Sequence, residues 1–109
     1  MNPQSITAPV LAQWLADHQR AQPLLLDVRE SGEVQVCQIA GSVHMAMQSV
    51  PNRLNEIDPE AVIVCICHHG ARSMQVARFL CQNGYENVIN LTGGIHAWAT
   101  DVDPAMATY

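Results

Sequence analysis

Lysine is absent from this 109-residue sequence, and its five basic residues are all arginines, against ten acidic residues. The resulting net charge of −5 argues against proteins that bind nucleic acid or anionic membranes through many cations. Long apolar runs are also missing, because runs such as 62–67 are far too short to cross a bilayer. Residues 1–5 lack the basic and apolar regions of a signal peptide. We therefore expect a cytoplasmic chain that binds neither nucleic acid nor membrane.

Cysteine and aromatic residues are scarce. The chain has four cysteines, two tryptophans, two tyrosines and one phenylalanine. This is too little cysteine for a secreted disulfide scaffold, which indicates free thiols in a reducing compartment. Apolar residues nevertheless make up 49% of the chain, enough for a core that needs neither metal nor disulfide. At this length we expect one domain spanning 1–109.

Short apolar runs alternate with helical patterns along the chain. The run 61–66 is the strongest strand signal, because it is β-branched and lacks the polar alternation of a half-exposed strand. Strands are expected at 24–28, 43–44, 61–66 and 88–91, and helices at about 8–18, 30–36, 51–57, 73–83 and 95–99. This order predicts an α/β fold with a mainly parallel sheet, whose ligands bind beyond the carboxyl ends of the strands.

Cys67 lies where the strongest strand runs into a polar loop. If the loop curls around this residue, the main-chain N–H groups of residues 68–72 converge on its sulfur as an anion nest. A helix that begins near Ser73 adds the positive end of its dipole, and Arg72 adds a permanent positive charge. Gly70 supplies the backbone freedom that such a tight loop needs. All these effects favour thiolate over thiol, whereas Cys65 and Cys81 fit the alternative of a buried structural cysteine.

The loop Cys67-His68-His69-Gly70-Ala71-Arg72-Ser73 resembles the active-site loop of rhodanese-type sulfurtransferases, Cys-x-x-Gly-x-Arg-Ser/Thr. Three further segments agree with this family, at 25–30, 39–42 and 91–98. The resemblance covers a core of about 5–100 and leaves 101–109 as a tail. It implies a three-layer domain with a five-stranded, mainly parallel sheet flanked by helices. It also implies a cysteine that accepts sulfane sulfur from a donor such as thiosulfate and passes it to a thiophilic acceptor such as cyanide or a thiol.

The resemblance assigns roles to the loop residues. Cys67 carries a persulfide and Arg72 assists it, and the rest of the substrate-binding loop consists of His68, His69, Gly70, Ala71 and Ser73. No cofactor is implied beyond the covalent persulfide. The expected partners are the small donor and acceptor and a sulfur-relay protein, and the expected state is a monomer or weak homodimer. Neutral imidazoles at positions that are basic in some thiosulfate-using members predict weak use of thiosulfate.

Several alternatives compete with this interpretation. Cysteine-dependent phosphatases place five residues between Cys and Arg, whereas four stand between Cys67 and Arg72, which disfavours them. A metal site is disfavoured because the cysteine and histidine ligands of 65–69 lack a second ligand cluster. A non-catalytic rhodanese-like binding module is the remaining alternative. Asp27, at the end of the neighbouring expected strand, either orients Arg72 and the loop or pairs with Arg29.

Overall fold

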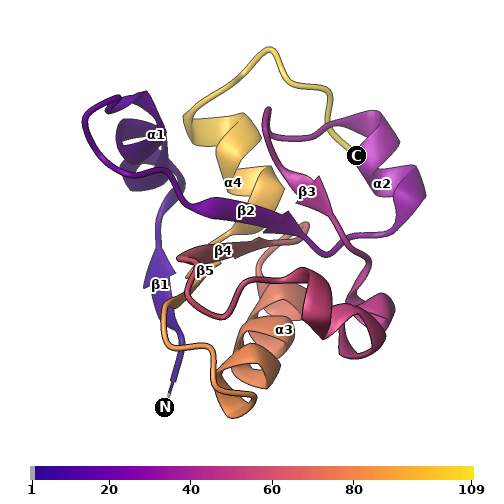
Figure 1. Ribbon diagram of the computed structural model, residues 1–109. Helices are drawn as coiled ribbons and strands as arrows, with labels where there is room; N and C mark the ends of the chain where they lie inside the picture. Colours follow the sequence, from indigo (N-terminus) through magenta and orange to yellow (C-terminus); the bar gives the residue numbers. More distant parts are fainter. Residues whose placement is uncertain (1) are drawn as a thin grey trace.

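The computed structural model describes residues 2–109. Five strands form one sheet in the order β1-β5-β4-β2-β3, and every neighbouring pair is parallel (Figure 1). The strands are β1 (Gln4–Ile6), β2 (Leu24–Asp27), β3 (Val43–His44), β4 (Ile63–Ile66) and β5 (Val88–Leu91). The structure therefore confirms the predicted α/β class and five-stranded sheet, and it shows that the sheet is wholly parallel.

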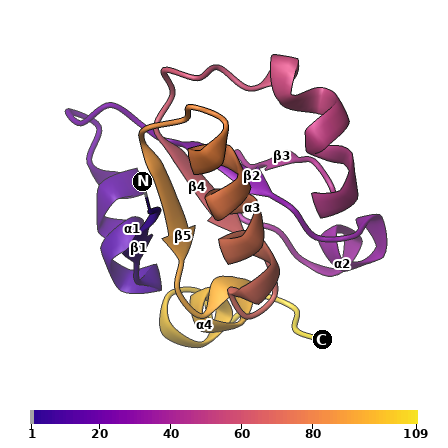
Figure 2. The same cartoon turned by 90° about the horizontal axis from the view of Figure 1, so that it is seen from below.

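Helical segments connect the strands. The α-helices are α1 (Ala8–Ala16), α2 (Ser31–Val36), α3 (Ala71–Gln82) and α4 (Gly94–Asp101), and two 3-10 helices lie at Met47–Ser49 and Pro51–Glu56. Helix α1 covers one face of the sheet and α3 the other (Figure 2). No helix within residues 2–109 is long and apolar enough to cross a membrane.

The central strand β4 shows why the sheet is covered on both faces. All four of its side chains are buried, and successive side chains of a strand point to opposite faces. Ile63 and Cys65 belong to a core cluster with residues of α3, while Val64 and Ile66 belong to a second cluster with residues of α1 and α4. Trp98 of α4 also packs in the second cluster. The result is a helix–sheet–helix sandwich with its central strand buried on both sides.

Some element boundaries differ from those expected. The edge strand β1 was not expected, because two of its three residues are exposed and its apolar signal is weak. Helix α3 begins at Ala71 rather than near Ser73, because Gly70 ends the loop directly before it with a φ of 108°. The expected helix at 51–57 is a 3-10 helix. The tail does not run free, since Tyr109 returns to α2 (Figure 1).

Candidate active site

Cys67 directly follows the central strand β4, between the carboxyl ends of β2 and β5. The residue is only 1% exposed. Its Sγ accepts a hydrogen bond of 3.0 Å from the N–H of Gly70, and the Ser73 Oγ lies 3.3 Å away. Within residues 2–109, the Gly70 N–H is the loop amide that donates to this sulfur, so the expected ring of amides is represented here by one amide and one hydroxyl.

Two glycines allow the loop to fold back on the sulfur. Gly70 has a φ of 108°, in the left-handed region that other residues rarely adopt, and it precedes α3 directly. Gly94 begins α4, where an added Cβ would overlap the carbonyl groups of Cys67 and His68. This close approach lets the N–H groups of Ile95 and His96 donate to those two carbonyls, at 2.8 and 3.0 Å. The first turn of α4 therefore fixes the backbone that carries the candidate nucleophile.

Asn90 on β5 contacts two of the residues around the sulfur, and the sequence did not predict it. Its side chain is buried, its Nδ2 donates to the Gly70 carbonyl at 3.2 Å, and its Oδ1 forms a short hydrogen bond with Ser73. The Ser73 hydroxyl has one proton, and its possible acceptors are the Asn90 Oδ1, the Gly70 carbonyl and the Cys67 Sγ. A polar residue inside an otherwise apolar strand was the available signal.

Arg72 lies in the first turn of α3 and holds Glu33 of α2. Its two terminal nitrogens donate to the two carboxylate oxygens at 2.8 and 2.7 Å. Hydrogen bonding from Arg72 lowers the pKa of Glu33 to about 2, so the carboxylate is charged at neutral pH. The side chains of Arg72 and Glu33 remain 33% and 21% exposed. Glu33 was not predicted, because the two residues are 39 positions apart and no motif links them.

Asp27 pairs with Arg29, the second of the two possibilities, and not with Arg72. Both side chains are almost fully buried, and Arg29 Nη2 lies 2.7 Å from Asp27 Oδ2. Arg29 also donates to the carbonyl of Cys37 at 2.7 Å and to the hydroxyl of Tyr109 at 3.0 Å. Asp27 therefore anchors an arginine that connects β2 to the end of α2 and to the C-terminal tail.

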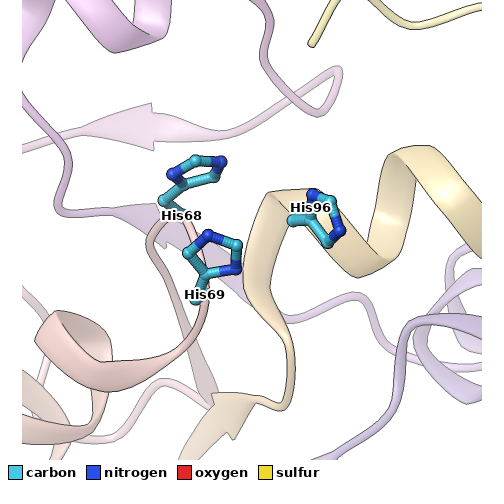
Figure 3. Close-up of side chains that lie close together, drawn as sticks. All are labelled: His68, His69 and His96. Atoms are coloured by element: carbon cyan, nitrogen blue, oxygen red, sulfur yellow. The ribbon is translucent and has the colours of Figure 1, made fainter. Parts of the chain in front are cut away.

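The histidines of the loop lie on the outer side of the site. The ring of His68 stacks on Tyr109, with 4.1 Å between centroids, and His69 and Ala71 are exposed. Burial, and after it the neighbouring His69, lowers the pKa of His68, which is therefore neutral at pH 7. The Nε2 of His44 donates to the carbonyl of Arg29 at 2.6 Å, which is a structural contact. His96 of α4 lies exposed beside the two loop histidines (Figure 3).

Comparison with known proteins assigns the chain to a family. The family model described as Rhodanese-like domain matches residues 11–101. A sulfurtransferase of Allochromatium vinosum is 38% identical over 102 residues, which are 94% of each chain. The thiosulfate sulfurtransferase GlpE of Tolumonas auensis is 30% identical and covers 68% of this chain and 70% of its own. A rhodanese-like domain protein of Staphylococcus aureus, solved by crystallography, superposes with a TM-score of 0.81 at 29% identity, over 87% of this chain and 90% of its own. The chain therefore belongs to the rhodanese-like family of sulfurtransferases.

Proposed function

We propose that this chain moves sulfane sulfur from a small donor such as thiosulfate to a thiophilic acceptor such as cyanide or a thiol, through a persulfide on Cys67. The observation that carries the proposal is the hydrogen-bonded Sγ of Cys67 at the end of the central strand. The Gly70 amide and the Ser73 hydroxyl stand where negative charge on sulfur needs donors. The family relationship supports sulfur transfer in general.

The reaction divides into two displacements. In the first, the Cys67 thiolate attacks the outer sulfur of thiosulfate, a sulfur–sulfur bond forms to Cys67, and sulfite leaves with the electron pair of the broken bond. In the second, cyanide or a thiolate attacks the terminal sulfur, and Cys67 leaves as a thiolate. Because one product leaves before the acceptor reacts, double-displacement kinetics are expected. No metal or organic cofactor is required.

Three features stabilise the anionic sulfur in this scheme. The Gly70 N–H donates to Sγ at 3.0 Å, and the Ser73 hydroxyl can turn from Asn90 to the sulfur. Helix α3 begins at Ala71, directly after the loop, so the positive end of its dipole lies near Cys67. Cys67 itself is only 1% exposed, so bulk water has little access to its Sγ. The donors stabilise the thiolate that leaves in the second displacement.

Arg72 and the loop histidines bear on the choice of donor. Arg72 is the cation nearest in sequence to Cys67, but Glu33 occupies both of its terminal nitrogens. His68 is neutral at pH 7 because of its lowered pKa. A free dianion therefore meets little unpaired positive charge at this loop. We infer that thiosulfate is a weak donor and that the persulfide of a relay protein supplies the sulfur. We further propose that the chain is cytoplasmic and is a monomer or weak homodimer.

A steady-state assay with thiosulfate and cyanide tests the proposal. Wild type should release thiocyanate with parallel double-reciprocal lines, and Cys67→Ser should release none. Cys81→Ser is the matched control, because Cys81 is a half-buried thiol on α3, and it should retain the activity. A relay-type persulfide, for example that of a small thiol, is tested in place of thiosulfate in parallel. If wild type and Cys67→Ser transfer sulfur equally from both donors, the proposal is wrong.

A further inference from the structure

Three histidines from two separate parts of the chain meet beside the candidate active site. His68 and His69 stand on the loop after β4, and His96 stands in the first turns of α4 (Figure 3). One ring nitrogen of each lies within 4.8 Å of the other two. The ring centroid of His69 lies 4.0 Å from that of His68 and 5.0 Å from that of His96. The sequence reasoning rejected a metal site because the loop ligands lacked a second cluster, and α4 supplies that missing ligand.

The backbone under these side chains is already fixed. The N–H of His96 donates to the carbonyl of His68 at 3.0 Å, and the N–H of Ile95 donates to that of Cys67 at 2.8 Å. Tyr109 stacks on His68 and restricts the orientation of that ring. Little main-chain entropy would therefore be lost when a ligand binds to these histidines, and a small entropy loss favours high affinity.

The chemistry of the cluster suits a borderline divalent cation better than an anion. Neutral imidazole is a good ligand for zinc and its neighbours in the first transition row. With metal–nitrogen bonds of about 2.0 Å, tetrahedral ligand nitrogens lie about 3.3 Å apart. Rotation of the exposed side chains of His69 and His96 can close the remaining gap.

We propose that His68, His69 and His96 form a three-imidazole site for one zinc ion or a similar divalent transition metal. Three protein ligands leave the fourth tetrahedral position open for water or an incoming sulfur ligand. Two of the ligands belong to the loop that holds Cys67 and Gly70, so a bound ion ties this loop to α4 through a second connection. The proposal is independent of sulfur transfer, because binding needs only the three side chains.

Calorimetric titration of untagged, reduced protein with zinc chloride tests the site. Wild type should bind one zinc ion per chain. His96→Ala should lose affinity by about 10-fold or more, since even the loss of an outer partner of a metal ligand costs that much. His18→Ala is the matched control, because His18 is an exposed histidine in the turn after α1, and it should bind zinc as wild type does. His96 lies outside the loop of Cys67, so its replacement leaves the loop sequence intact.

Cobalt substitution distinguishes imidazole from thiolate ligands. Cobalt bound by three imidazoles should give visible absorption bands without a thiolate charge-transfer band, and Cys67→Ser should bind as wild type does. The proposal is overturned if wild type binds no zinc, if His96→Ala binds as tightly as wild type, or if the cobalt complex shows a charge-transfer band that Cys67→Ser abolishes. Circular dichroism of each variant verifies that its fold is intact, and Asn or Gln replaces Ala at position 96 if it is not.

Discussion

Replacing Glu33 with Gln should make the chain a better user of thiosulfate. Glu33 accepts two hydrogen bonds from Arg72, at 2.8 and 2.7 Å, and so occupies the guanidinium face that an anionic donor needs. The pKa of Glu33 is lowered to about 2, which keeps this pairing complete at neutral pH. A neutral Gln still accepts the N–H of Glu30, which Glu33 holds at 2.9 Å in the capping box of α2. The substitution thus removes the charge and retains the local structure.

The exposure of the pair sets the size of the effect. The side chains of Arg72 and Glu33 are 33% and 21% exposed, so solvent screens their attraction. Exposed pairs contribute about 0–1 kcal/mol, and the two-point geometry here places this one near 1 kcal/mol. An anionic donor that must displace Glu33 from Arg72 therefore loses about 1 kcal/mol of binding free energy. Because about 1.4 kcal/mol corresponds to a factor of ten, we expect kcat/KM for thiosulfate to rise about fivefold in Glu33→Gln.

Steady-state cyanolysis, with thiosulfate and cyanide varied in turn, measures this effect. The gain should appear in kcat/KM for thiosulfate, since cyanide reacts after the donor has left. Glu56→Gln is the matched control, because Glu56 pairs with Arg53 on the surface in a similar two-point geometry, and its kinetics should equal those of wild type. An unchanged or lower kcat/KM for thiosulfate in a folded Glu33→Gln would refute the reasoning and make Glu33 a residue that positions Arg72 for catalysis.

Three further predictions concern the loop and its support. Gly70→Ala should lose about 1–2 kcal/mol of unfolding free energy in urea, because its φ is 108°, and it should no longer form the persulfide. Gly84→Ala is the control, with a φ of 91° and open space around an added Cβ, and it should lose similar stability but keep activity. Equal activity in both variants would contradict the role of the loop. Ser73→Ala should slow persulfide formation about fivefold in stopped-flow assays, because a hydrogen bond contributes about 1 kcal/mol, and an unchanged rate would show that the hydroxyl 3.3 Å from the sulfur is idle. The pKa of Glu33 falls from 4.5 to about 2 on folding, so its stabilising effect is present above about pH 4.5 and is lost as the pH falls towards 2. Unfolding free energies of wild type and Glu33→Gln should therefore converge between these pH values, and a constant difference would argue against the Arg72 pairing.

The elements of the fold could be predicted where burial requires a run of apolar residues in the sequence. The run ending at Ile66 is apolar on both faces, which predicted a central parallel strand, and the structure places β4 in the middle of the sheet. Strand β1 could not be predicted, because a three-residue edge strand needs only Ile6 to pack inwards. The start of α3 was misplaced by two residues, since the positive φ of Gly70 ends the loop more sharply than the sequence pattern indicated.

Only those site residues that lie close together in the sequence could be predicted. Cys67, Gly70 and Ser73 were identified from the loop, and the structure brings them together. Glu33 and Tyr109 were not, because contacts across many residues of sequence depend on how α2 and the tail pack. Within the described residues, the partner of Asp27 was one of two stated possibilities, and its burial beside Arg29 decides between them.

Intact mass spectrometry after brief exposure to a sulfur donor tests the persulfide most directly. Wild type should gain one sulfur atom, peptide mapping should place it on Cys67, and cyanide should remove it. Cys67→Ser should gain none, while Cys81→Ser should behave as wild type. If sulfur appears equally on wild type and Cys67→Ser, or if Cys67 stays unmodified with every donor, then the hydrogen-bonded sulfur at the end of β4 is not the carrier.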